Sequence, residues 1–310
     1  MGENLLYHVQ NLILWECNYV EYRRKPLDLK IGIVGQGFVG TALKEIFNKY
    51  YITNTFDIKD LINEIGYSSA KDLSVDCDIC FVCVPTPMNK DGSCNLSIIE
   101  SVINELDSYK NNNIAVIKST IPPGTTERLN SQCQNLKVVF SPEFLTEANF
   151  IDDFKNQTRV IIGGPRPAST KVKNLFIKAF PDIKIIKTGS NTAESVKYFT
   201  NCFLTVKVGF ANEFKQICDK VNVDFDKVVE YGLYDKRIGT THLSVPGPDG
   251  MPGFGGSCFP KDLNALISVA AENGVDAKIL TAAWDKNLEV RPEKDWELLK
   301  GRAVMEEKGE

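Results

Sequence analysis

One stretch decides the fold of this chain: Leu29-Lys30-Ile31-Gly32-Ile33-Val34-Gly35-Gln36-Gly37-Phe38-Val39-Gly40. It begins as a short β-rich run, passes through a G-x-G-x-x-G turn and continues into a helical pattern. In such a turn the first glycine permits tight turning, the second admits a pyrophosphate, and the third lets the helix pack against the strand. The helix N-terminus offers N–H groups to the anion. The stretch therefore predicts the phosphate-binding part of a dinucleotide fold.

A second β-rich run indicates which dinucleotide is bound. Residues 52–56 lead to Asp57, at about the ~20-residue spacing at which an acid accepts the ribose hydroxyls. A carboxylate there repels a 2′-phosphate, so NAD is expected rather than NADP. A glycine turn in an unrelated α/β protein is disfavoured because strand, glycines, helix and acid agree. The residues expected to contact NAD here are Gly35, Gly37, Phe38, Val39, Gly40 and Asp57.

Composition limits the classes of function. The chain has 310 residues, 43% apolar and 25% charged, which allows one large or two modest domains. Its formal charge of −4 argues against nucleic acid or an anionic membrane as a partner, so any anion site is local. Nine cysteines without a small-scaffold spacing, and no recognisable signal peptide, favour a reduced cytoplasmic setting without disulfides.

No metal site is expected. Cys77, Cys80 and Cys83 form a C-x-x-C-x-x-C run, but the run reads as a buried strand. Positions three apart in a strand point to opposite faces, and no fourth ligand is evident, so these thiols are interpreted as small core residues. Only His8 and His242 are available, which disfavours a His-dependent hydrolase.

The order of apolar runs predicts an α/β fold with a doubly wound, mostly parallel sheet. Strand-like runs at 77–84, 114–117, 137–140, 160–162 and 183–186 alternate with helical patterns such as 96–106 and 170–180. Ligands of such sheets bind at the carboxyl ends of the strands. The loops there, at 85–87, 119–126 and 141–147, therefore hold candidate site residues.

The second half of the chain reads as helical. A long helix is expected over about 192–221 and shorter ones at 225–231, 261–273 and 276–288, forming a small all-helical domain on a long connecting helix. The predicted division is an N-terminal extension (1–28), an NAD-binding Rossmann-like domain (29–190), a central helical domain (191–290) and a tail (291–310). An apolar run at 12–15 is too short to span a bilayer.

Cys258 is the candidate nucleophile. It lies in Gly255-Gly256-Ser257-Cys258-Phe259-Pro260-Lys261-Asp262, beside small residues, a cation and a carboxylate. A nearby positive charge favours the thiolate, which is a good nucleophile. Upstream, Lys197 and Asn201 stand four apart, so both can reach one substrate oxygen from the same helix face. A solvated helix face is the alternative interpretation of that pair.

These blocks together resemble the UDP-glucose/GDP-mannose dehydrogenase family, from about residue 30 to residue 302. The matching blocks are 35–40, 84–87, 118–120, 142–147, Ala193-Glu194 with Lys197 and Asn201, 210–213, Asp235 with 237–239, and 253–262. The resemblance favours UDP-glucose over GDP-mannose or a UDP-N-acetylhexosamine as substrate, with a role in nucleotide-sugar metabolism and polysaccharide biosynthesis.

The resemblance implies an NAD-dependent four-electron oxidation of UDP-glucose to UDP-glucuronate through a Cys258 thiohemiacetal and thioester. It implies that Lys197 and Asn201 stabilise the oxyanions. Asp262, through a water held by Thr120, would handle the alcohol proton, and Glu143 would assist hydrolysis. Cofactor contacts are also expected from Pro85, Thr86, Thr120, Glu147 and Lys261. Substrate contacts are expected from Glu143, Phe144, Leu145, Lys197, Asn201, Arg237, Phe254, Gly255 and Cys258.

The resemblance also implies a homodimer through the central helical domain, because in the family Arg237 reaches the sugar nucleotide of the neighbouring subunit. Two departures from the family are expected. A second Rossmann-like domain is absent, and the loop at 241–251 is longer than usual. We hypothesise that this loop and the tail at 291–302 replace part of the lost nucleotide contacts.

Two other functions remain open. A one-step β-hydroxyacid dehydrogenase also joins a Rossmann domain to a helical domain, but its two-electron chemistry needs no thiol, so Cys258 discriminates the two. A nucleotide-binding remnant without turnover is the other alternative, because a fold alone does not prove activity.

Overall fold

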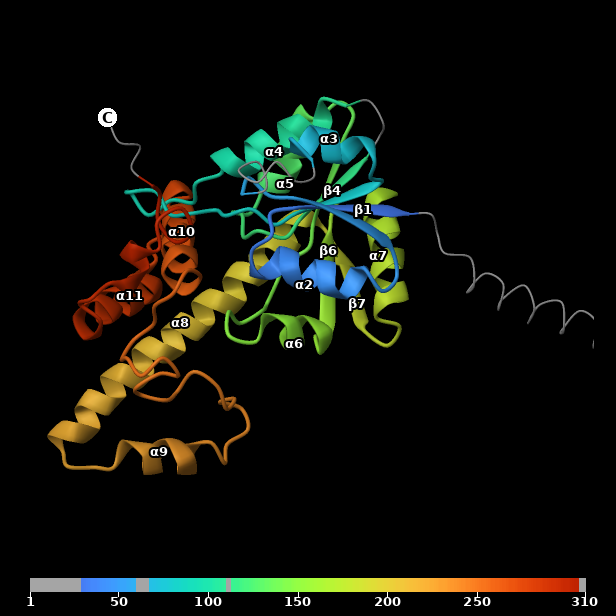
Figure 1. The fold of residues 1–310 in the computed structure, drawn as a ribbon. Helices are drawn as coiled ribbons and strands as arrows, with labels where there is room; N and C mark the ends of the chain where they lie inside the picture. The colour runs from blue at the N-terminus through green and yellow to red at the C-terminus, as the bar shows by residue number, and fades with distance from the viewer. Residues whose placement is uncertain (1–28, 60–66, 110–112, 307–310) are drawn as a thin grey trace, which may run out of the picture.

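The computed structural model describes residues 29–59, 67–109 and 113–306. The expected N-terminal extension at 1–28 and its apolar run lie outside the described residues, as does the end of the tail. Within the described ranges, an α/β part holds the first half of the chain and a helical part holds the second (Figure 1).

A seven-stranded sheet forms the centre of the first half, in the order β2-β1-β3-β4-β5-β6-β7. Neighbouring strands pair in parallel except β5 and β6, which pair antiparallel at Phe140 and Gly163. The predicted mostly parallel, doubly wound sheet is therefore confirmed. The strands are β1 (Lys30–Val34), β2 (Ile52–Phe56), β3 (Ile79–Val82), β4 (Ile114–Ile117), β5 (Lys137–Phe140), β6 (Arg159–Gly163) and β7 (Lys184–Thr188).

Helices cover both faces of the sheet, and each face has its own apolar cluster. In β3, Ile79 and Phe81 pack into one cluster and Cys80 and Val82 into the other, as the two-residue repeat of a strand requires. One face is covered by α2 (Phe38–Phe47), α6 (Phe150–Lys155) and α7 (Ala168–Ala179), and the other by α3 (Ala70–Val75), α4 (Ser97–Asp107) and α5 (Thr125–Gln132) (Figure 1).

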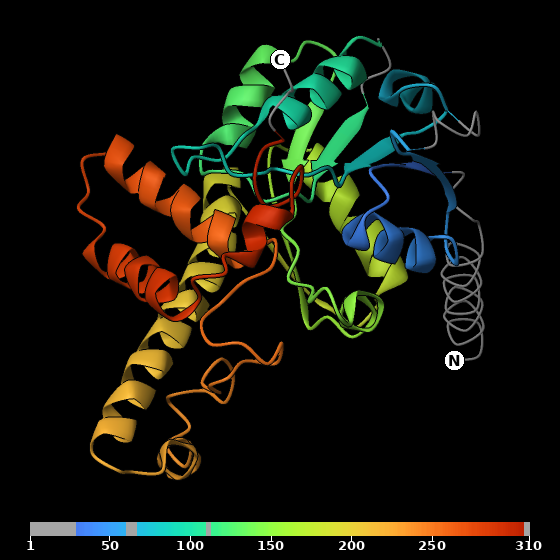
Figure 2. The same ribbon diagram turned by 60° about the vertical axis from the view of Figure 1, so that its left-hand side comes forward.

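One helix, α8 (Ser190–Lys220), joins the two halves. It begins against the sheet, where Ala193 is buried in the second cluster, and runs for 31 residues away from it (Figure 2). On it pack α10 (Phe259–Glu272) and α11 (Lys278–Val290), while α9 (Phe225–Gly232) lies beyond its end. The four predicted helices of this half agree with the structure to within about two residues.

The tail leaves α11 and returns to the α/β part. Its 3₁₀ helix η2 (Asp295–Leu298) buries Trp296 against Trp284, with 5.2 Å between ring centroids. Further along, Met88 donates its N–H to the Ala303 carbonyl at 2.8 Å and accepts from Met305 N at 3.0 Å. These main-chain bonds fasten the tail to the loop that follows β3.

The cysteine run differs in one respect from its predicted geometry. Cys77 precedes β3, so it is free of the strand alternation, and its thiol hydrogen-bonds that of Cys80 on the same side of the sheet. That bond lowers the pKa of Cys77 and raises the pKa of Cys80. The expectation that both thiols face opposite ways is wrong, while their burial in the core is confirmed.

No group of three or more His, Cys, Asp or Glu side chains among the described residues is arranged to hold a metal ion. Among the helices of the described ranges, none has the length and apolar character needed to cross a bilayer.

Candidate active site

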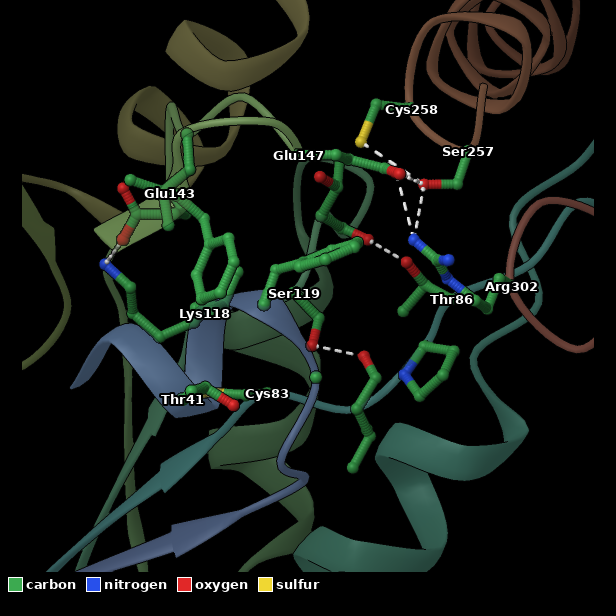
Figure 3. Close-up of a pocket in the computed structure, with 18 of the residues that line it drawn as sticks. Thr41, Cys83, Thr86, Lys118, Ser119, Glu143, Glu147, Ser257, Cys258 and Arg302 are labelled. Carbon is green, nitrogen blue, oxygen red and sulfur yellow. Dashed lines mark hydrogen bonds and ion pairs between the residues drawn. The ribbon is translucent and has the colours of Figure 1, made fainter. Parts of the chain in front are cut away.

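A cavity of about 520 Å³ opens where the carboxyl ends of the central strands meet the start of α10 (Figure 3). Its walls come from the loops after β1, β3, β4 and β5, together with α8, α10 and the tail. The three loops predicted from sequence therefore meet at one place. The predicted residues that line the cavity are Gly37, Phe38, Val39, Pro85, Thr86, Thr120, Glu143, Leu145, Glu147, Lys197, Cys258 and Lys261.

Each of the three glycines of the G-x-G-x-x-G turn has a different structural role. A Cβ on Gly35, whose φ is +91°, would lie 2.7 Å from the Cys83 carbonyl oxygen, and one on Gly40 would lie 1.9 Å from the Gly35 carbonyl oxygen. These two glycines serve the fold and do not line the cavity. A Cβ on Gly37 would meet nothing within 4 Å. The space beside Gly37 is therefore free for a ligand.

Asp57 braces the phosphate loop. Its Oδ2 accepts from Gln36 N at 2.7 Å and its Oδ1 from Lys59 N at 3.0 Å. Asp57 does not line the cavity, whereas Gln36 and Lys59 do. No side-chain hydrogen bond caps the start of α2 at Gly37, so its first N–H groups are available to an anion. The open approach at Gly37 and this helix start fit the diphosphate of NAD.

Cys258 is the N-cap residue of α10 and its thiol is exposed toward the cavity (Figure 3). The Oγ of Ser257 lies 3.8 Å from its Sγ. Burial alone would lower the pKa of Lys261, but Asp262, Cys258 and Cys94 outweigh it and raise that pKa above its ordinary value. Lys261 thus remains a cation three residues from Cys258, and both side chains line the cavity.

Two lysines converge on Glu143. Lys118 lies with its Nζ 3.0 Å from Glu143 Oε2, and Lys197 donates from Nζ to the Glu143 main-chain oxygen at 2.6 Å. The other carboxylate oxygen, Oε1, accepts from Phe144 N at 2.9 Å. Glu143 and both lysines line the cavity, so they place two positive charges and one negative charge along its inner wall.

Asn201 and Asp262 face each other and not the cavity. Asn201 Nδ2 donates to Asp262 Oδ2 at 2.7 Å, and Lys261 Nζ donates to Oδ1 at 2.5 Å. Both side chains are buried, and neither is among the lining residues. The four-residue spacing therefore brings only Lys197 of the predicted pair to the cavity wall.

Three other predicted substrate residues lie elsewhere. Phe254 is buried in the core of the helical part, and Gly255 would clash with Arg291 and Asp295 if it carried a Cβ. Arg237 is exposed on a loop beyond α9 and pairs with Asp235 at 2.5 Å. Phe144 packs beside the cavity, where the Nζ of Lys197 lies 5.3 Å from its ring centroid.

Eight polar residues that line the cavity were not among the residues predicted from sequence, namely Gln36, Thr41, Lys59, Lys118, Ser119, Thr146, Ser257 and Arg302. Five of them, Gln36, Lys118, Ser119, Thr146 and Ser257, lie inside the motif blocks that carried the family resemblance, so those blocks were an available signal. Arg302 was covered only by the general expectation for the tail at 291–302, because its partner Glu147 is 155 positions away in the chain.

The expected loop and the tail contact each other. Arg291 donates from Nη2 to Asp249 of the loop at 2.7 Å and from Nε to Asp295 of the tail at 2.6 Å. Asp295 in turn accepts from Gly256 N at 2.9 Å. The two segments thus hold the backbone just before Cys258.

Both halves of the chain match models of a known protein family. Residues 58–180 match the model of the UDP-glucose/GDP-mannose dehydrogenase family NAD binding domain, and residues 191–289 match that of the family's central domain. The chain belongs to the UDP-glucose/GDP-mannose dehydrogenase family. The resemblance predicted from the motif blocks is therefore confirmed, and so is NAD as the cofactor of the matched domain.

Individual members of this family agree with the models. UDP-glucose 6-dehydrogenase of Rickettsia bellii is 35% identical over 216 residues, which is 67% of this chain and 49% of the relative. The structure of a UDP-glucose dehydrogenase from Pyrobaculum islandicum superposes with a TM-score of 0.77 at 26% identity, over 89% of this chain and 71% of that one. The chain thus spans about half the length of the first of these relatives.

A smaller enzyme shares the fold. The 3-hydroxyisobutyrate dehydrogenase of Mycobacterium tuberculosis superposes with a TM-score of 0.69 at 16% identity, over 86% of this chain and 95% of that one. At this identity the likeness concerns the fold alone.

Proposed function

We propose that this protein oxidises UDP-glucose to UDP-glucuronate in two NAD-dependent steps through a covalent intermediate on Cys258. One observation carries the proposal: the exposed Cys258 thiol lines the same cavity as the phosphate loop of the NAD-binding domain. A thiol at this place serves an oxidation beyond the aldehyde, which an alcohol dehydrogenase does not require.

The C6 alcohol loses a proton and a hydride and becomes an aldehyde, to which the Cys258 thiolate adds to form a thiohemiacetal. Loss of a second hydride and a proton leaves a thioester, and water cleaves it to a carboxylate and the free thiol. NAD supplies the hydride acceptor in both oxidations, so two NAD molecules are consumed for each sugar.

The side chains along the cavity wall suit these steps. Lys197 carries a positive charge beside Glu143 and would stabilise the oxyanion that develops on the sugar oxygen. Glu143 lines the cavity and would assist water in the hydrolysis. Thr120 also lines it, while Asp262 is buried, so proton transfer to Asp262 would pass through a bound water.

The proposal includes a homodimer through the central helical part. Phe199, Phe203 and Phe210 are exposed on one face of α8, at spacings of four and seven residues. Several large apolar side chains exposed on one face are unusual for a monomer and typical of a protein interface. The exposed Arg237 would then be free to reach a nucleotide sugar held by the second copy.

The location proposed is the cytoplasm. All cysteines of the described ranges are free, Cys258 among them, and a catalytic thiol requires a reducing setting.

The decisive experiment counts NADH formed per sugar consumed, with limiting UDP-glucose and excess NAD. Two per sugar is the expected result. One per sugar would indicate an alcohol dehydrogenase or a stalled thioester. If UDP-glucose gave none, GDP-mannose and UDP-N-acetylhexosamines would be tested in the same way, and NAD binding without any turnover would identify a nucleotide-binding remnant.

A further inference from the structure

Arg302 brings a positive charge from the tail into the cavity. Its Nη2 donates to Glu147 Oε1 at 3.0 Å and to Ser257 Oγ at 3.3 Å (Figure 3). Its guanidinium carbon lies 5.0 Å from the centroid of the Phe38 ring. Glu147 follows β5, Ser257 precedes α10 and Phe38 begins α2. The tail thus supplies a residue that meets three separate walls of the cavity.

The position of Arg302 does not depend on its ion pair. The main-chain hydrogen bonds from Met88 N to the Ala303 carbonyl and from Met305 N to the Met88 carbonyl fix the backbone directly after it, and buried Trp296 anchors the chain before it. Removing the side chain of Arg302 therefore leaves these tail contacts in place. A loss of ligand affinity in such a variant would report on the guanidinium itself.

The guanidinium of Arg302 has N–H donors that its two hydrogen bonds do not use. Both of its hydrogen bonds leave from Nη2, so Nε and Nη1 donate to no described residue. The side chains of Arg302 and Glu147 are 43% and 42% exposed, which makes this an open pair of small energetic value. An anion entering the cavity could take up the remaining donors without first breaking a buried contact.

The cavity itself indicates which anion that is. Arg302 lies over Phe38, the first residue of α2, and the N-terminal turn of α2 offers its N–H groups beside the open space at Gly37. Helix N-termini bind phosphate, and a guanidinium matches phosphate oxygens with two parallel hydrogen bonds.

We propose that Arg302 contacts the diphosphate of bound NAD, so that the tail completes an anion site that α2 begins. This inference rests on NAD as the ligand of the domain, and not on the turnover proposed above. It gives the tail a direct part in cofactor binding, where the sequence had suggested only a general role in nucleotide contacts.

The test is a calorimetric titration of NAD into the whole chain and into Arg302→Ala. The variant should bind NAD about ten-fold more weakly, equivalent to about 1.4 kcal/mol. Arg128→Ala is a matched control. Arg128 of α5 pairs with Glu100 of α4 at 2.7 Å, and the two side chains are 42% and 39% exposed. This control should bind NAD like the unaltered chain. Adenosine, which has no phosphate, should bind equally to all three.

A second variant separates the effect of the tail's position from the effect of the Arg302 charge. Met305→Pro removes the N–H that Met88 accepts while keeping Arg302, and it should also weaken NAD by displacing the tail. The melting temperature of each variant checks that it is folded.

UDP-glucose is titrated in parallel because it carries the other diphosphate. Weaker binding of UDP-glucose with unchanged NAD affinity in Arg302→Ala would overturn the inference, as would unchanged affinity for both. Absence of NAD binding by the unaltered chain would overturn it together with the cofactor assignment, whereas normal NAD binding without turnover would overturn only the proposed function.

Discussion

Lys118 and Glu143 form a buried ion pair, with 3.0 Å between Nζ and Oε2 and side chains 2% and 8% exposed. Lys118 follows β4 and Glu143 follows β5, so the pair ties two adjacent strand ends together beneath the cavity. Lys118 also donates to the Pro142 carbonyl at 3.3 Å. Because both charges are removed from water, each depends on the other for compensation.

Replacing Lys118 by Met should destabilise the protein strongly. The change leaves the Glu143 carboxylate buried without its cation, which typically costs about 3–5 kcal/mol. Thermal unfolding followed by circular dichroism measures the loss. The double variant Lys118→Met/Glu143→Gln removes both charges and should regain part of the stability. A double variant no more stable than Lys118→Met would show that the single change acts through packing and not through charge.

Two glycine substitutions should separate binding from folding. Gly37→Ala places its Cβ in open space, so the melting temperature should stay close to that of the unaltered chain while NAD affinity falls at least about ten-fold, because the methyl group occupies the approach of the diphosphate. Gly40→Ala drives its Cβ to 1.9 Å from the Gly35 oxygen and should lower the melting temperature. Equal losses of stability in both variants would contradict this division.

The sequence predicted the cofactor loop well because its determinants are local. Strand, glycines and helix start lie within a dozen residues. Gly35 and Gly40 have steric requirements that the structure bears out, while Gly37 leaves space open for a ligand. The helices α8 and α10 were equally predictable from their apolar periodicity. The short helices α3, α5 and α6 were not predicted. The segments of α3 and α6 have six residues each and are too brief to show a period, and α5 has only Leu129 as a large apolar residue.

The parts of the site that the sequence did not predict depend on contacts between distant segments. The four-residue spacing of Lys197 and Asn201 places both on one helix face. It does not reveal that Asn201 donates its side-chain hydrogen bond to Asp262 of α10. Likewise, Arg302 reaches Glu147 only because the tail folds back over the sheet. Such pairs follow from the tertiary fold and have no signature in either segment.

Stability should fall as the pH rises through the acid range because of Glu194. Burial raises the pKa of this carboxyl, and hydrogen bonds from Thr126 and Gly124 only partly oppose the rise. A group with a raised folded pKa stabilises the fold most below its unfolded pKa of about 4.3, and this contribution is lost as the pH rises through the folded value.

Glu194→Gln should therefore flatten the dependence of melting temperature on pH between about 4.5 and 7, by on the order of a few degrees. The exposed Glu230 of α9 offers a control, and Glu230→Gln should leave the slope as it is. If the Glu194→Gln profile ran parallel to that of the unaltered chain, Glu194 would not titrate differently in the two states.

The aromatic stripe on α8 predicts the oligomeric state. The unaltered chain should sediment as a dimer of the 34.6 kDa protomer, and Phe203→Asp should shift it toward the monomer by placing a charge in the apolar contact. Ile58→Asp alters another exposed apolar residue, which follows β2 at the sheet, and should leave the dimer intact. A monomeric unaltered chain, or a dimer unaffected by Phe203→Asp, would exclude α8 as the interface.

Cys258→Ser tests the covalent chemistry most directly. A serine keeps the size and exposure of the side chain, but its hydroxyl is a far weaker nucleophile than a thiolate at neutral pH. Conversion of UDP-glucose to UDP-glucuronate should fall by at least about 1,000-fold, whereas NAD affinity should stay unchanged because the diphosphate site is formed by other residues. Single-turnover mixing with mass spectrometry of the intact protein follows the fate of the sugar. The unaltered chain should show a transient adduct that the variant lacks. A variant that still released two NADH per sugar at the normal rate would remove Cys258 from the mechanism and favour direct oxidation of a hydrated aldehyde.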